Sequence, residues 1–185
     1  MKKIIAILMA AVMLLTFAAC GEKESETVSV SPLELMNKVW EVIPEDQRFP
    51  AIGGDYTEEN LVDGAPGTFG IADLSEVDRV LGFPEAEGSK VLAAASLTHA
   101  MLSNNFTLGA YQIEAGADMD ALANALVENI QARQWICGFP EQLLVAYYGD
   151  CLIGGFGLTE QLGSFETALK TAYPDVVIVS TAPIA

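Results

Sequence analysis

The sequence predicts an α+β fold, a two-layer sandwich in which two helices cover one face of an antiparallel sheet. In the C-terminal half, segments with strand periodicity and segments with helical periodicity follow in the order strand, helix, strand, strand, helix, strand. This βαββαβ order is the ferredoxin-like arrangement. An amphipathic N-terminal helix precedes it. With 185 residues, 51% of them hydrophobic, the chain is long enough to bury a core without disulfides or a structural metal.

The N-terminal helix is predicted over residues 31–43. Ser31 stands before Pro32, which suits the first helical position, and Pro44 ends the segment. Apolar residues recur on one helical face: Leu33, Met36, Val39, Trp40 and Ile43. This stripe predicts a helix packed against the sheet.

Residues 44–105 carry weaker signals. Residues 44–70 are rich in glycine, proline and acids, which is typical of a loop. Residues 71–81 predict a short helix or a turn. Residues 90–101 are predicted to be extended because they precede a strand, although their alanine-rich composition also fits a helix.

The C-terminal half is more clearly patterned. Its predicted elements are a strand at 106–113, a helix at 118–134, strands at 143–148 and 151–156, a helix at 159–172, and a strand at 175–181. Gly149 and Asp150 separate the two middle strands and predict a two-residue hairpin turn.

The first twenty residues have the pattern of an export signal. Two lysines precede an apolar stretch over residues 4–18, which is too short to span a bilayer. Phe17-Ala18-Ala19-Cys20 resembles the bacterial lipobox, whose cysteine becomes the lipidated first residue, although leucine usually stands where Phe17 does. We therefore predict a signal peptide at 1–19 and lipidation at Cys20, where two acyl chains would give stable anchoring. An ordinary cleaved signal is the alternative.

The predicted mature chain has two parts. Residues 20–30 form the lipidated cysteine and a polar, flexible tether, and residues 31–185 form a single α+β domain. The expected location is the extracytoplasmic face of the cell membrane. Nine basic against 25 acidic residues give a net charge of −16, which argues against a nucleic-acid partner.

The chain resembles the short, uncharacterised lipoproteins of Gram-positive bacteria that carry a domain of unknown function. The resemblance covers residues 31–185 and depends on Ala110-Tyr111-Gln112-Ile113, Arg133-Gln134, Gly138-Phe139-Pro140-Glu141 and Tyr148-Gly149-Asp150. It implies export, lipidation and an α+β fold. It implies no activity.

No set of residues predicts catalysis, a metal site or a cofactor. His99 is the only histidine, and Cys137 and Cys151 are predicted to be two separate, largely buried thiols rather than a disulfide. After Cys20, the only candidate site is weak. It consists of Arg133, Gln134, Trp135 and Glu141, which are predicted either to bind a ligand or to cap a helix and fill the edge of the core.

These observations favour a non-enzymatic, lipid-anchored module that binds an envelope protein or a small ligand. One alternative is a transport-associated solute-binding lipoprotein, although such proteins usually have two lobes. The other is an envelope hydrolase that uses paired carboxylates.

Overall fold

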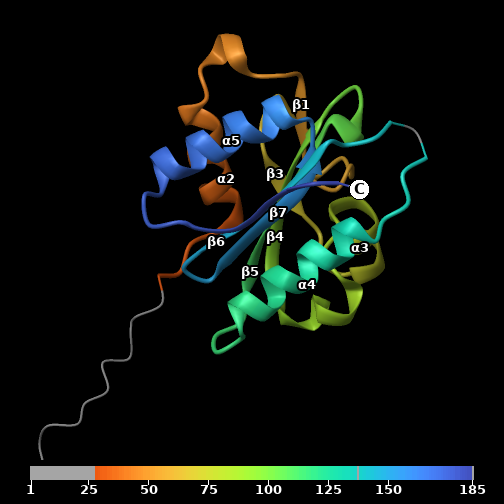
Figure 1. Ribbon diagram of the computed structural model, residues 1–185, viewed down its shortest axis with the longest axis vertical. Helices are drawn as coiled ribbons and strands as arrows, with labels where there is room; N and C mark the ends of the chain where they lie inside the picture. Colours follow the sequence, from red (N-terminus) through yellow and green to blue (C-terminus); the bar gives the residue numbers. More distant parts are fainter. Residues whose placement is uncertain (1–27, 137, 185) are drawn as a thin grey trace, which may run out of the picture.

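In the computed structural model, residues 28–136 and 138–184 are described, and they form an antiparallel sheet between two layers of helices (Figure 1). The predicted signal peptide at 1–19, the predicted lipidation site Cys20 and the residue Cys137 lie outside the described residues.

Eight strands form the sheet of the described residues. They are β1 (Ala51–Gly53), β2 (Val62–Asp63), β3 (Gly67–Phe69), β4 (Val91–His99), β5 (Phe106–Ile113), β6 (Gln142–Tyr148), β7 (Cys151–Gly157) and β8 (Val177–Pro183). The order is β2-β1-β4-β5-β7-β6-β8, and β3 also pairs with β4. All of these pairs are antiparallel.

Four α-helices lie in the described part of the chain, on two faces of this sheet. They are α2 (Pro32–Val42), α3 (Leu74–Leu81), α4 (Met119–Gln131) and α5 (Thr159–Ala172). Short 3₁₀ turns are η1 (Glu45–Gln47), η2 (Glu85–Lys90) and η3 (Ser103–Asn105). Side chains of α2 and α5 form one buried cluster with the sheet, and those of α3 and α4 form another on the opposite face (Figure 1).

The prediction of a two-layer sandwich with both helices on one face is wrong, because α4 and α5 cover opposite faces. In a ferredoxin-like sheet the last strand lies beside the first. Here β4 takes that place beside β5, and β8 pairs with β6 at the edge. The crossovers β5-α4-β6 and β7-α5-β8 therefore run in the same direction across the sheet from antiparallel starting strands. Since such crossovers are right-handed, their helices lie on opposite faces.

The predicted elements of the C-terminal half are all present, and the hairpin is confirmed, since Tyr148 pairs with Cys151 across the turn. The helix predicted at 31–43 is also confirmed, although the Ser31 side chain makes no capping hydrogen bond. The extended segment predicted at 90–101 is confirmed as β4, and the helix or turn predicted at 71–81 is α3. The sheet is larger than predicted because β1, β2 and β3 arise from residues 44–70, which the sequence predicts to be a loop.

The end of the predicted tether is bound to the β6–β7 turn. The backbone N–H of Asp150 donates to the carbonyl of Val28, and the Asp150 carboxylate accepts hydrogen bonds from Ser29 Oγ and the Val30 N–H. Gly149 has φ +58°, and a Cβ there would lie 1.9 Å from the Val28 carbonyl oxygen, so this contact requires glycine.

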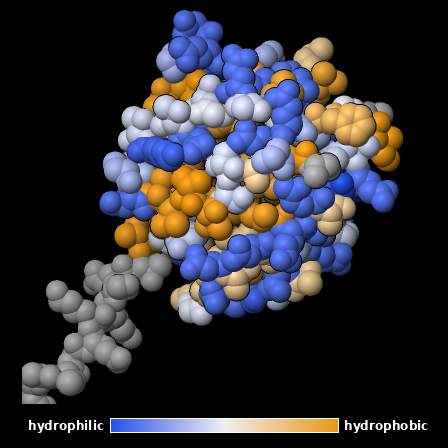
Figure 2. All heavy atoms as spheres, viewed as in Figure 1, coloured by the Kyte–Doolittle hydropathy of each residue, from blue (hydrophilic) through white to orange (hydrophobic). Residues whose placement is uncertain are grey.

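The face of the molecule drawn in Figure 2 has both hydrophilic and hydrophobic regions. Figure 2 shows hydrophilic side chains over the two helix layers and hydrophobic atoms in the strip between them, where β8 forms one edge of the sheet. Within the described part of the chain, we find no helix with the length and apolar character needed to cross a membrane.

Candidate functional site

Helix α3 provides the frame of the candidate site. It begins at the Asp73 side chain, which accepts hydrogen bonds from the N–H groups of Ser75 and Glu76. It ends at Gly82, whose φ of +80° is left-handed and whose N–H donates to the carbonyl of Asp78. This short helix therefore presents its last carbonyls toward the α4–β6 loop.

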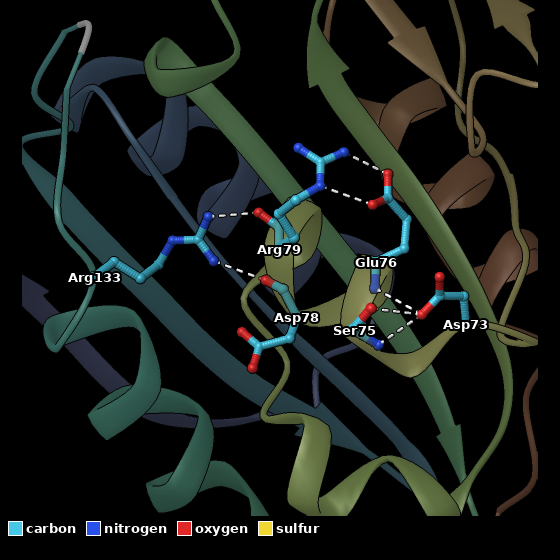
Figure 3. Close-up of polar contacts among 6 residues, drawn as sticks. All are labelled: Asp73, Ser75, Glu76, Asp78, Arg79 and Arg133. Carbon is cyan, nitrogen blue, oxygen red and sulfur yellow. Dashed lines mark hydrogen bonds and ion pairs between the residues drawn. The ribbon is translucent and has the colours of Figure 1, made fainter.

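Arg133, in that loop, binds these carbonyls (Figure 3). Its guanidinium donates to the carbonyl oxygen of Asp78 at 2.8 Å and to that of Arg79 at 2.7 Å. A cation is favourable at a helix C-terminus because the unpaired carbonyls carry partial negative charge. Arg133 thus caps α3 from a distant part of the sequence.

Two aromatic rings fix the guanidinium of Arg133 in place. Its central carbon lies 5.4 Å from the ring centre of Trp135 and 5.2 Å from that of Phe156, which are within the range of cation–π contacts. The two rings pack edge to face with centres 4.6 Å apart. Burial lowers the pKa of Arg133, but a guanidinium starts so high that it stays charged.

A polar cavity of about 270 Å³ opens beside this guanidinium. We call it the α3 pocket, and its lining residues are Tyr56, Arg79, Val80, Ser103, Asn104, Thr107, Arg133 and Phe156. Arg79 lies on α3 and forms a bidentate ion pair with Glu76 (Figure 3). Two of the three arginines of this acidic chain therefore line the pocket.

The α3 pocket has the donors that an oxyanion requires. A guanidinium has five N–H groups in a planar fork, and the described contacts of Arg133 use two of them on α3. Ser103 also lines the cavity and has a hydroxyl, whereas the hydroxyl of Thr107 donates to the carbonyl of Ser103. Close by, the indole N–H of Trp135 is buried without a hydrogen-bond partner among the described residues. The arrangement can bind and orient a carboxylate or a phosphate.

The structure brings together only part of the site predicted from sequence. Arg133 and Trp135 are in contact, whereas Gln134 between them is exposed. Glu141 has a different role: its carboxylate accepts a hydrogen bond from the N–H of Thr159 at 2.9 Å, at the start of α5. This bond lowers the pKa of Glu141, as expected for a carboxylate that caps a helix N-terminus.

A second cavity lies on the opposite face of the sheet, between α2, η1 and α5. We call it the α5 pocket; it measures about 400 Å³ and is lined by Trp40, Ile43, Asp46, Gln47, Arg48, Phe49, Glu160, Gln161 and Ser164. It contains the third arginine, which lies over the ring of Trp40. The sequence offered one signal for both pockets: arginine occurs at only three positions, and all three line these cavities.

Two other side chains of potential chemical interest, Cys151 and His99, are buried or already hydrogen-bonded. The thiol of Cys151 is fully buried, as predicted, and burial raises its pKa to about 12. His99 stacks on Phe49 and accepts backbone hydrogen bonds through Nδ1. The described residues contain no group of three or more His, Cys, Asp or Glu side chains placed to bind a metal ion.

No family model, curated protein or solved structure matches the chain.

Proposed function

We propose that the chain is a lipid-anchored extracytoplasmic binding module, without catalytic turnover, whose α3 pocket binds a small oxyanion. One observation carries the ligand class: the half-buried guanidinium of Arg133 is fixed by two carbonyls and two rings, with donor groups left over beside a polar cavity. A fixed fork of donors loses little entropy on binding a carboxylate or phosphate.

The charge of the chain makes this pocket selective. With a net charge of −16, most of the surface repels anions, so an anion gains attraction only near the few basic side chains, two of which line the α3 pocket. Arg79 is partly neutralised by Glu76, which leaves Arg133 as the main binding group. The proposed ligand is therefore small enough to enter the cavity and approach one guanidinium.

Phosphate and acetate titrations followed by NMR test the ligand class. We expect a saturable shift of the Arg133 Nε–H signal with at least one of these anions. Arg133→Lys keeps the charge and loses the fork, so affinity should fall at least tenfold. Gln134→Lys, which adds a charge at the exposed neighbour, should not improve binding. Equal binding by wild type and Arg133→Lys would refute the fork as the binding group.

The anchor rests on the lipobox-like Phe17-Ala18-Ala19-Cys20 and needs its own test. Mass spectrometry of the purified chain should find Cys20 at the N-terminus with a mass increase that matches two or three acyl chains. Cys20→Ser should abolish this modification and release the protein from the membrane fraction. An unmodified Cys20 in the processed chain contradicts the anchor and leaves the anion site untouched.

A further inference from the structure

The α5 pocket has features that the proposed oxyanion site lacks. Its walls are apolar where Trp40, Ile43 and Phe49 line it, and it has groups of both charges. Its volume of about 400 Å³ lies within the range of small-molecule sites. It lies on the α2 and α5 side of the sheet, so it is separate from the α3 pocket (Figure 1).

Arg48 provides an anchored positive end. Its Nε donates to the carbonyl of Ile43 at 2.9 Å, a second nitrogen donates to the carbonyl of Glu41 at 3.3 Å, and the guanidinium lies 5.5 Å from the ring centre of Trp40. Trp40 is itself fixed, because its indole N–H donates to the carbonyl of Gly64. Arg48 therefore keeps donor groups in a defined position for a carboxylate.

The opposite wall provides acceptors. The Oε1 of Gln161 is buried and has no donor among the described residues. A buried acceptor left unpaired is unfavourable, and such groups in native proteins usually find a water, an ion or a ligand. Glu160 and Asp46 line the same cavity with carboxylates. A positively charged hydrogen-bond donor in this cavity could pair with Gln161 Oε1 and would be attracted by the two carboxylates.

We propose that the α5 pocket binds a free amino acid with an apolar side chain. Its carboxylate would pair with Arg48, and its ammonium would donate to Gln161 Oε1 beside Glu160. The side chain would pack against Trp40, Ile43 and Phe49. This site goes beyond the oxyanion site and does not depend on it.

Tryptophan fluorescence isolates the pocket, because the chain has two tryptophans and only Trp40 lines the α5 pocket. The full-length Trp135→Phe variant, purified in detergent, is titrated with L-leucine. We expect a saturable change in Trp40 emission with a Kd of about 1 mM or lower. In the Trp40→Phe variant, Trp135 should not respond. The absence of a saturable signal up to 20 mM, confirmed by calorimetry, would overturn the proposal.

Two partial ligands test the double recognition. Isoamylamine lacks the carboxylate of leucine and 4-methylpentanoate lacks its ammonium, so each should bind at least tenfold more weakly. If either binds as well as leucine, the proposed recognition of both ends is wrong.

Gln161→Met tests the unpaired oxygen. The substitution removes an acceptor that has no donor among the described residues, so the melting temperature should stay the same or rise while leucine affinity falls at least tenfold. Gln134→Met is the matched control at an exposed position and should leave the affinity unchanged. Unchanged affinity in Gln161→Met would refute the role of Gln161.

Discussion

The two faces of the sheet use an arginine in the same way, but over different sequence distances. On each face an arginine donates to carbonyls near the end of a helix and lies over a tryptophan beside a cavity. Arg133 reaches carbonyls 54 and 55 residues away, whereas Arg48 reaches carbonyls five and seven residues away. The first contact is therefore tertiary and the second is local.

This difference predicts different contributions to stability. A local contact can form in part in the unfolded chain, so its loss affects both states. The contact of Arg133 with α3 exists only when the α4–β6 loop lies against that helix. Removal of each arginine in turn measures the difference.

The largest effect is expected for Arg133→Met. It leaves the carbonyls of Asp78 and Arg79 without their charged donor and removes the cation from Trp135 and Phe156. The free energy of unfolding should fall by about 3 kcal/mol, since hydrogen bonds to charged groups contribute about 1.5–3 kcal/mol. Chemical denaturation measures this fall. A loss under 1 kcal/mol would contradict a tertiary role.

Arg48→Met should have a smaller effect. Its two hydrogen bonds go to Ile43 and Glu41 within the same short stretch. Because these local bonds can form in part in the unfolded chain, we expect the free energy of unfolding to fall by only about 1 kcal/mol. If this variant loses as much as Arg133→Met in the same denaturant series, the contrast between the two faces fails.

Acid should affect the loop beside α3, through Asp55. Burial pushes the pKa of Asp55 up, but hydrogen bonds from Thr57, Asn60 and Gly70 outweigh it and lower the pKa to about 2 from 3.8. A lowered folded pKa gives stability that is present above pH 3.8 and is lost as the pH falls toward 2. Because Asp55 is close to solvent, screening reduces this contribution to the free energy of unfolding to about 1 kcal/mol. Denaturation from pH 5 to 2 should show a shallower fall for Asp55→Asn than for wild type.

The smallest effect is expected for Arg79→Met. Its ion pair with Glu76 is exposed and local, so the free energy of unfolding should change by less than about 0.5 kcal/mol. We expect Arg79 to attract the anion to the α3 pocket rather than to stabilise the fold. Titration of the variant with phosphate should then show weaker binding at unchanged stability, whereas a large loss of stability would assign Arg79 to the fold.

Element types were predictable wherever a segment's own pattern decides them. The spacing of Leu122, Leu126 and Ile130 predicts α4, and these residues are buried on one face. Gly149 and Asp150 likewise predict the turn between β6 and β7. The layering was not predictable, because it depends on which strand lies beside β8, and no local pattern encodes that neighbour.

The limits of the site prediction have a similar cause. Arg133 and Trp135 are close in sequence, so their contact could be anticipated. Tyr56, Arg79 and Thr107 come from three other segments and meet Arg133 only in the folded chain. Strands β1, β2 and β3 have two or three residues each, too few for a two-residue periodicity to be recognised.

The attachment of Val28 to the β6–β7 turn has a mechanical consequence. A pull on the N-terminal segment would load the hydrogen bonds of Asp150 with Val28, Ser29 and Val30 before it reached α2. Asp150 also accepts a hydrogen bond from the N–H of Ile113 on β5, so the force would spread into the middle of the sheet. The β6–β7 turn would therefore bear the tension before α2 did.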